Sequence, residues 1–313
     1  MLQSLPDVQP VEYKSVSFDL NTLKSTLNEA PLQAKGAITH NAKEIELPYP
    51  DGSFKRFRVV NAPIMQSGLA AAFPDIQTYR VAGIDDPTAY GRLSITRAGF
   101  HGLITSSTES IYIDPFSAEL PGYVMVYDRD KHVESFTRRV GVERHEPIVS
   151  DPQIEAASRA AAESAEPMIS GTELREHRLA QAVTAQFTQF HSSPTRCETP
   201  DEPVACGLSA VVVGINRVNT LYERDVAVTL TLVDNNELLI YTDVNDQPYN
   251  NNDTFGQLSQ NQANIDNVIG SANYDIGHVF NTAGGGVASL GSVCSSTRKA
   301  QGVSGLPQPI NDP

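Results

Sequence analysis

A stretch dominated by Ala, Glu, Ser and Pro divides this chain of 313 residues into two parts. It runs from Arg144 to His177 and holds few large apolar side chains. Such a segment cannot bury enough surface to offset its ordering entropy, so we expect an exposed linker with transient helix, where a protease can cut. An ordinary surface helix is the alternative. The length allows two domains, which we place at 1–146 and 174–313, with the linker at 147–173.

The part before the linker is rich in short extended segments. From about Val16 to Val140, runs of β-branched and aromatic residues alternate with turn residues. The clearest turn is Pro50-Asp51-Gly52, where Pro presets φ and Gly accepts a positive φ between two extended runs. Further runs follow at 76–84, 90–105, 110–116 and 123–130. We therefore predict a β-rich domain.

The part after the linker has a different pattern of apolar and polar residues. Residues 177–191 suggest a strand, residues 225–243 suggest two extended runs around an Asn235-Asn236 turn, and residues 257–270 suggest a helix. Between the first two lies an amphipathic helix of about four turns, because apolar side chains recur there at three-and-four spacing. Its apolar positions are Leu208, Val211, Val212, Ile215, Val218 and Tyr222. This order predicts a mixed α/β domain, and an α+β or mixed fold class for the chain.

The charge balance limits the partners. The chain carries 37 acidic and 23 basic residues, a formal charge of −14. This excess repels nucleic acid and anionic lipid at long range, so we expect no nucleic-acid partner. No segment approaches the roughly 18 consecutive apolar residues of a membrane helix, so we expect no membrane span, and the opening residues lack a signal-peptide pattern. The protein is then cytoplasmic, or its address signal lies outside this sequence.

The glycine-rich segment from Ser271 to Gly305 is the first candidate site. A phosphate-binding loop needs a Lys after its second anchor Gly, but Ser292 and Val293 follow Gly291. No two of the seven His residues have the one-turn spacing of a helical metal site, and Pro147 follows His145-Glu146. We therefore predict neither a nucleotide site nor a metal site here.

Other chemistry-bearing patterns are equally weak. The sequence has no Gly-x-Ser-x-Gly nucleophile elbow. Asp85-Asp86 and Asp225 could act as paired acids, but solvated turn carboxylates are the simpler interpretation. The Asn/Asp-rich loop from Asp243 to Asp253 departs from the EF-hand spacing, which leaves calcium binding open. Residue chemistry alone predicts no active centre.

The three cysteines allow two interpretations. Cys197 and Cys206 flank a short Pro-rich loop that could close as a local disulfide, which leaves Cys294 without a partner in the chain. In a secreted protein such a residue is a free thiol or has a partner elsewhere. The alternative is three reduced cysteines in a cytosolic protein.

Two long segments resemble a known family. "LSAVVVGINRVNTLYERDVAVTLTLV" and "NIDNVIGSANYDIGHVFNTAGGGVASLGSVCSSTRKAQGVSG" resemble the N-terminal part of the catalytic domain of reprolysin-type (adamalysin-like) zinc metalloproteases, in the metzincin clan. The upstream segment "VVNAPIMQSGLAAAFPDIQTYRVAGIDDPTAYGRLSITRAGFHGLI" resembles the propeptide of secreted bacterial members. The resemblance covers the chain from about residue 40 to its end, and it implies a β-rich prodomain before a metzincin-like mixed sheet with helices.

The resemblance implies a substrate-binding strand. In the family a Gly-hydrophobic-Ala segment, followed by Gly and then Cys, forms the exposed edge strand of the catalytic sheet, and here Gly291 and Cys294 occupy the last two positions. A peptide substrate can add itself to such an edge as a further strand. The positions implied to bind it are Gly285, Gly286, Val287, Ala288 and Ser289. The family also implies that Cys294 pairs with a downstream cysteine.

The family's chemistry is not carried by these residues. It rests on a His-Glu-x-x-His motif with a third His, which binds zinc and which this sequence lacks. We therefore expect a precursor fragment of a secreted zinc endopeptidase, with no catalytic or metal-binding residue of its own and with the zinc ligands beyond residue 313. The fragment should be inactive and monomeric, with its prodomain in contact with the catalytic part in cis and peptides or proteins as substrates.

Two alternatives remain open. The chain could be a secreted, non-catalytic binding module, a pseudo-protease whose edge strand at 285–291 captures extended peptides. It could also be an intracellular β-rich protein with an ancestral likeness to proteases, in which case its cysteines are reduced.

Overall fold

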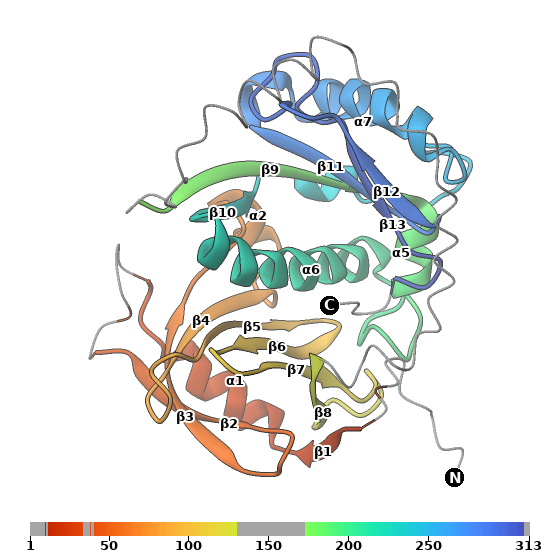
Figure 1. The fold of residues 1–313 in the computed structure, drawn as a ribbon. Coiled ribbons are helices and arrows are strands. Elements are labelled where there is room, and N and C mark those ends of the chain that lie inside the picture. Colours follow the sequence, from red (N-terminus) through yellow and green to blue (C-terminus); the bar gives the residue numbers. More distant parts are fainter. Residues whose placement is uncertain (1–9, 11, 34–37, 39–40, 130–172, 310–313) are drawn as a thin grey trace.

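The computed structural model describes residues 10, 12–33, 38, 41–129 and 173–309. They form two β-sheets with the long helix α6 (Pro203–Asp225) lying between them (Figure 1). The large antiparallel sheet, the second sheet and the helices confirm the predicted mixed, α+β fold class. The predicted linker at 147–173 lies outside the described residues apart from Glu173, so the domain boundaries stay a prediction.

The first sheet is entirely antiparallel. Its strands lie in the order β1-β8-β7-β6-β5-β4-β3-β2. Gly52, with φ +85°, sits in the turn between the second and third strands, as its Pro-Asp-Gly sequence predicts. The strands are β1 (Lys14–Ser17), β2 (Lys43–Pro48), β3 (Phe54–Asn61), β4 (Gln77–Gly83), β5 (Tyr90–Thr96), β6 (Gly99–Thr105), β7 (Ser110–Pro115) and β8 (Tyr123–Asp128).

The second sheet is parallel except at one edge. Its order is β10-β9-β11-β13-β12, and only the β12–β13 pair is antiparallel. A single antiparallel edge strand on an otherwise parallel sheet is common in mixed folds. The strands are β9 (Arg175–Val183), β10 (Val228–Leu232), β11 (Ile276–Asn281), β12 (Gly285–Ala288) and β13 (Gly302–Gly305).

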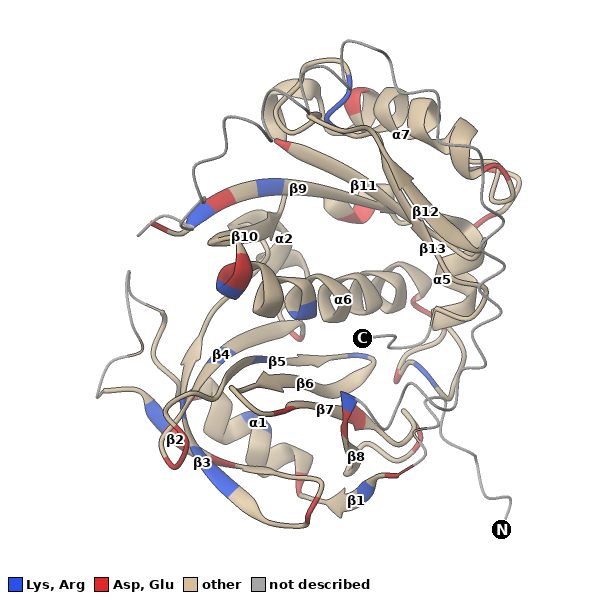
Figure 2. Cartoon of the chain, viewed as in Figure 1, with Lys and Arg blue, Asp and Glu red and all other residues tan. Residues whose placement is uncertain are grey.

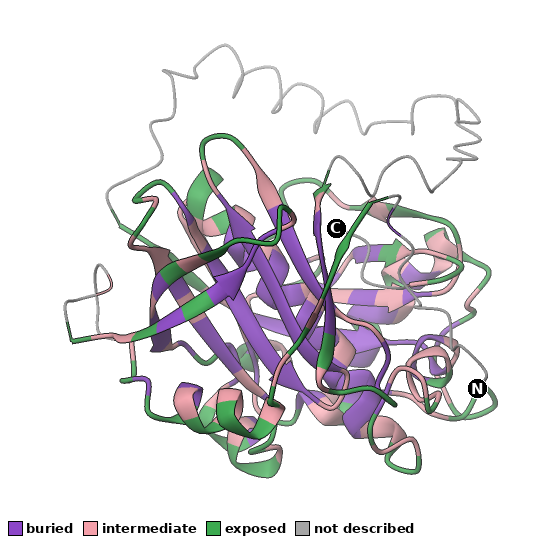
Figure 3. Cartoon of the chain, turned by 90° about the horizontal axis from the view of Figure 1, so that it is seen from below, coloured by how far each residue is buried: buried purple, intermediate pink, exposed green. Residues whose placement is uncertain are grey.

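Helices cover both faces of the second sheet. Successive side chains of a strand point to opposite faces. In β9, accordingly, Leu179 and Val183 pack into the core that faces α6, whereas Ala180 and Ala182 pack into the core that faces α7 (Thr254–Val268) (Figure 1). The helix predicted at 257–270 is therefore present, and it begins three residues earlier. Figure 3 shows the buried residues concentrated along the strands and the central helix.

Helix α6 is buried by both sheets. It runs for 23 residues, longer than the four turns that its apolar spacing predicts. It is the one described helix that is long and apolar enough to cross a membrane, but 72% of its most apolar window is buried inside the protein, as in a core helix. Its apolar side chains Val211, Val212 and Ile215 join the core under the second sheet, and its other side contacts β5 and β6.

The prediction of one strand over residues 177–191 is wrong beyond Val183. The strand ends there and helix α5 (Ala185–His191) begins. Thr184 is the cause, because its extended backbone ends the strand and its Oγ1 accepts a hydrogen bond from the Phe187 N–H, as a helix N-cap does.

The second extended run predicted after Asn235-Asn236 is also wrong. Residues Asn236–Leu239 form a 3₁₀ helix instead. The fully buried Asn236 side chain accepts from the Gln181 N–H and donates to the Gln181 carbonyl, at 2.8 and 3.0 Å. This amide thus satisfies backbone groups of β9 that a neighbouring strand would otherwise satisfy.

Two short helices in the first part are not predicted by the sequence patterns. Helix α1 (Leu20–Asn28) buries Leu27 against the first sheet. Helix α2 (Ser67–Ala72) instead buries Leu69 in the core of the second sheet. Its N-terminal end is held there by Asp234, which accepts a hydrogen bond from the Leu69 N–H at 2.9 Å. The two parts of the chain therefore share the core under the second sheet that faces α6.

Candidate peptide-binding edge strand and the residues that support it

Strand β12 has one strand neighbour in the described part of the chain. It pairs with β13, with Gly285 opposite Gly305 and Ala288 opposite Gly302. Continuing this register puts Ser289 opposite Gln301, and the Ser289 N–H donates to the Gln301 carbonyl at 2.9 Å. Residues of an antiparallel strand alternate between bonding to the partner and pointing away. The backbone N–H groups of Gly286 and Ala288 therefore point out from the sheet, where an added strand could accept them.

The start of β12 requires glycine. Gly285 has a φ of +89°, a left-handed region that a residue with a Cβ adopts at a cost. A Cβ on Gly286 would lie 3.0 Å from the Val303 carbonyl oxygen of β13. Gly284 has open space around it and no positive φ. The triple glycine thus allows the backbone to turn into the edge strand. The residues of the strand itself are small, and most of them are exposed.

Asn281 holds the loop before β12 in place. Its side-chain oxygen accepts a hydrogen bond from the Ala283 N–H at 2.9 Å, and its amide nitrogen donates to Oε1 of Gln257 on α7 at 2.7 Å. Both side chains are buried. The sequence gives little sign of this role, because an Asn before a glycine run is also common in solvated loops.

A pocket of about 460 Å³ lies where β12 begins. Gly285 and Gly286 line one side of it, while Leu103, Tyr112 and Phe116 of the first part line another. We call it the inter-sheet pocket. The first part of the chain thus reaches the start of the candidate edge strand.

A buried charge cluster joins the first sheet to α6. Asp114 on β7 is fully buried and accepts a hydrogen bond from Arg217 Nη2 at 2.5 Å and from the Tyr127 hydroxyl at 2.7 Å. Burial, together with the nearby Asp114 carboxylate, raises the pKa of Tyr127. His101 Nε2 lies 3.8 Å from the same carboxylate. Burial is the larger influence on this histidine and lowers its pKa to about 4.

A second buried pair lies further along the same helix. Glu223 accepts from Arg92 of β5 and lies 3.3 Å from Arg80 of β4. Arg92 also donates to Oδ1 of Asn216, whose amide in turn donates to the Leu93 carbonyl. Figure 2 shows the charges of α6 at its C-terminal end, apart from one basic residue further along the helix. The sequence patterns did not predict that Arg80 and Arg92 pair with Glu223. A charged residue within an apolar helix indicates that it needs a partner, but not which residue the partner is.

The described residues do not fit a zinc site. Among them, no three His, Cys, Asp or Glu side chains lie together in a way that could hold a metal ion. His278, on β11, which β13 separates from the edge strand, faces Ser304 Oγ at 3.2 Å and Gln181 Nε2 at 3.4 Å. Desolvation lowers its pKa to about 4. It therefore has the surroundings of a structural histidine, and His145-Glu146 lies outside the described residues.

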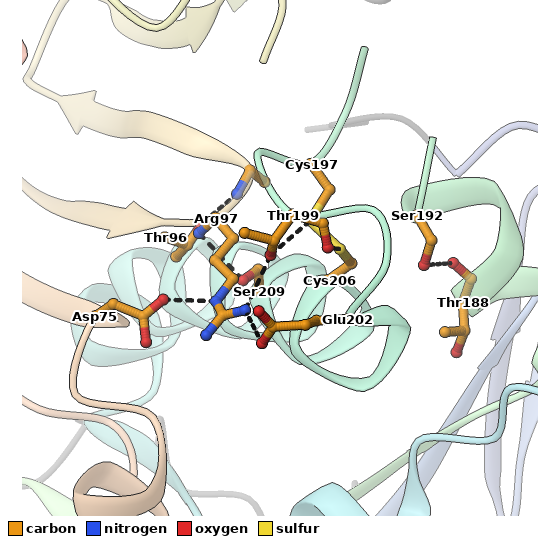
Figure 4. The surroundings of a disulfide bond; sticks show 11 residues. Asp75, Thr96, Arg97, Thr188, Ser192, Cys197, Thr199, Glu202, Cys206 and Ser209 are labelled. Atoms are coloured by element: carbon orange, nitrogen blue, oxygen red, sulfur yellow. Dashed lines mark hydrogen bonds and ion pairs between the residues drawn. A yellow bond between two sulfur atoms is a disulfide. The ribbon is translucent and has the colours of Figure 1, made fainter. Parts of the chain in front are cut away.

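Cys197 and Cys206 form a disulfide in the structure (Figure 4). Their Cα atoms are 5.8 Å apart, and the loop that they close leads into α6. Arg97 of the first part lies beside this loop and bonds Thr199 at 2.9 Å, Glu202, and Asp75 at 2.6 Å. The disulfide loop is therefore another contact between the two parts.

The other residues that the sequence suggested as functional lie apart from the edge strand or bond to residues close to them. Cys294 is exposed and unpaired. Asp85 bonds Arg56 and Asp225 bonds the neighbouring Arg224, so these carboxylates do not form an acid pair. In the loop at 243–253, Asp253 caps α7 by accepting from the Gly256 N–H at 2.9 Å.

Comparison with known proteins finds a family match within the second part of the chain. Residues 208–312 match the model of the family described as Metallo-peptidase family M12B Reprolysin-like. The match spans about a third of the chain, from α6 through β12 and β13, and it confirms the resemblance over that segment. No curated protein matches the chain significantly. A solved structure described as "Structure of a chaperone-substrate complex" is 11% identical over 41% of this chain and 95% of that chain, with a TM-score of 0.26, too weak a likeness to support any argument.

Proposed function

We propose that residues 173–309 are the peptide-holding part of a secreted zinc-dependent endopeptidase, and that β12 holds the substrate. The observation that carries this proposal is the open edge of β12, with the N–H groups of Gly286 and Ala288 directed outward, inside the segment that matches the reprolysin-like family. An extended peptide that lies antiparallel to β12 would add a further strand to the sheet. The exposed, small side chains of Gly285, Gly286 and Ala288 leave room for its backbone.

Zinc belongs to this proposal through the family alone. Because the described residues do not fit a zinc site, we derive no catalytic step from them. The zinc ligands would come from residues outside this sequence, and we expect the purified chain to bind no tight zinc and to cleave no peptide. Metal analysis of the purified chain tests this statement, since stoichiometric, tightly bound zinc would contradict it. A non-catalytic peptide-binding module would use the same edge strand.

The contacts of the first part of the chain support a prodomain role, which is part of our proposal. This part holds α6 through the buried pairs Asp114–Arg217 and Arg92–Glu223, and it reaches the inter-sheet pocket at the start of β12. We propose that it assists folding of the second part and restricts access to the edge strand by its bulk. The Cys197–Cys206 disulfide supports secretion, because disulfides persist in oxidising compartments.

Hydrogen exchange with a bound peptide tests the edge strand. The purified full chain would be mixed with an extended, Pro-free peptide of about ten residues, which is long enough to form a complete strand. We expect slower amide exchange at Gly286 and Ala288 and unchanged exchange in the first sheet. The same measurement after cleavage at a protease site engineered between residues 147 and 172 shows whether the first part restricts access.

A proline variant separates strand addition from binding elsewhere. Ala288→Pro removes an outward N–H and leaves the bonds to β13 in place, since Pro is tolerated on the open side of edge strands. We expect it to lose the peptide-dependent protection of Gly286. Ala288→Val is the matched control, which keeps the N–H and should keep the protection. Equal protection in both variants would rule out β12 as the peptide-binding edge.

A further inference from the structure

The inter-sheet pocket is lined by buried polar atoms that have no hydrogen-bond partner among the described residues. Arg217 is nine-tenths buried and lines the pocket, and its Nε and Nη1 atoms make no hydrogen bond to the part of the chain that the structure describes. Nη2 of the same guanidinium is used by Asp114. The buried Nε2 atom of His191, on another side of the pocket, is also unpartnered. Buried donors without acceptors are costly and rare in proteins, so these atoms indicate a missing partner.

The charged side chains that line the pocket are basic, and Asp114, which pairs with Arg217, is not among the lining residues. Two arginines, Arg196 and Arg217, line the pocket, and no Asp or Glu is among the described residues that do so. This is the opposite of the whole chain, which is strongly acidic. His101 and His191 also line it. Burial lowers their pKa values to about 4 and about 3, so both rings are neutral near pH 7 and can still donate or accept a hydrogen bond.

Most of the other lining residues are apolar, although Ser117, Thr195, Asn281 and Ser304 also line the pocket. Leu103 and Phe116 come from the first part, Val213 and Leu221 from α6, and Phe280 from β11. The volume of about 460 Å³ lies within the range of about 300–1,000 Å³ that is typical of small-molecule sites. A ligand that fits must therefore combine a large apolar body with one anionic group.

We propose that the inter-sheet pocket binds a small molecule that carries a carboxylate on an apolar body, with one carboxylate oxygen on Nη1 of Arg217. A guanidinium N–H donates a strong, charge-assisted hydrogen bond to a carboxylate oxygen. The apolar body lies between the first sheet and α6 and contacts both. Such a ligand bridges the two parts of the chain, and the site needs no zinc and no peptidase activity.

Calorimetric titration of the full chain tests the proposal with two probes. Octanoate represents an acyl source of the carboxylate, and N-acetyl-leucine represents the carboxyl end of a peptide. Saturable binding of either probe supports the site and identifies the source. The amide of the same probe should bind at least about tenfold more weakly, because it loses the ion pair with Arg217. No saturable binding of either probe, or equal binding of acid and amide, would overturn the proposal.

Two variants locate the site. Arg217→Lys keeps a positive charge for Asp114 but removes Nη1, so we expect binding at least about tenfold weaker. Gly214→Leu adds side-chain atoms to the pocket, because Gly214 lines it and a Cβ there meets only Phe280, at 3.7 Å. It should abolish binding, whereas Gly214→Ala should retain it. If Arg217→Lys does not fold, the comparison of Gly214→Leu with Gly214→Ala tests the location of the site. Unchanged ligand binding by Gly214→Leu would contradict the assignment.

Discussion

The carboxylate of Asp114 on β7 and the guanidinium of Arg217 on α6 form a buried ion pair across the two parts of the chain, with Nη2 2.5 Å from Oδ1. The residues are 103 positions apart, and the second oxygen of Asp114 accepts from the Tyr127 hydroxyl. Buried charges are tolerated only when they are paired and hydrogen-bonded. Each part of the chain therefore carries a charge that the other part must neutralise, which couples the stability of the two parts.

Removing one partner of this pair should destabilise the protein strongly. In Asp114→Asn the Arg217 charge stays buried without its counter-ion, and we expect the free energy of unfolding to fall by about 3–5 kcal/mol. Urea denaturation followed by circular dichroism measures this. Asp85→Asn is the matched control, since Asp85 pairs with Arg56 on the surface and its loss should leave the unfolding midpoint almost unchanged. Equal shifts in the two variants would contradict the coupling.

The stability of the protein should fall between pH 6.5 and pH 4. Burial lowers the pKa of His101 from 6.5 to about 4, with Asp114 opposing and Arg217 reinforcing the shift. In this window the unfolded chain binds a proton at this residue and the folded chain does not, so stability is full above pH 6.5 and declines with acidification. The contribution of His101 to the free energy of unfolding is on the order of 3 kcal/mol.

The variant His101→Gln isolates that contribution. Gln cannot take up the proton, so the dependence of the unfolding free energy on pH should become flatter between pH 6.5 and pH 4, whatever the variant's stability at pH 8. Urea unfolding at several pH values gives the two curves. Parallel curves for the variant and the parent would show that His101 is not the group responsible.

Loss of the disulfide should weaken the start of α6. A cross-link over nine positions restricts the unfolded chain, and the double variant Cys197→Ser, Cys206→Ser should lose about 2–3 kcal/mol of unfolding free energy. Cys294→Ser is the control, because Cys294 is exposed and unpaired, and it should leave stability unchanged. Thiol titration of the parent protein under denaturing conditions should detect a single reactive thiol, and three would contradict the disulfide.

The turn into the edge strand should depend on Gly285 and not on its neighbour. Gly285→Ala forces a Cβ into a φ of +89°, which costs about 1–2 kcal/mol. We expect faster amide exchange throughout β12 and weaker peptide-dependent protection. Gly284→Ala has open space and no positive φ, so exchange in β12 should match the parent protein. Hydrogen exchange read by NMR or mass spectrometry distinguishes these outcomes.

Local patterns predicted the elements whose own sequence specifies them. The Pro50-Asp51-Gly52 turn is present because Gly52 adopts a positive φ, and the helices at α6 and α7 are present because their apolar spacing matches the helical period. Local patterns failed at Asn236, whose side chain bonds the backbone of β9, 55 residues earlier, and so replaces an expected strand with a 3₁₀ turn. No window of sequence around Asn236 contains its partner.

The sequence by itself determined the mixed fold class, the glycine turn into β12 and the likeness of residues 208–312 to the reprolysin-like family, because each depends on local periodicity, backbone conformation or family pattern. Only the tertiary structure decided that β12 has β13 as its one strand neighbour among the described residues, since strand order depends on contacts between distant residues. It alone also placed Asp114 against Arg217. Charges buried on separate segments are costly until folding brings them together, and their pairing is a property of the assembled protein.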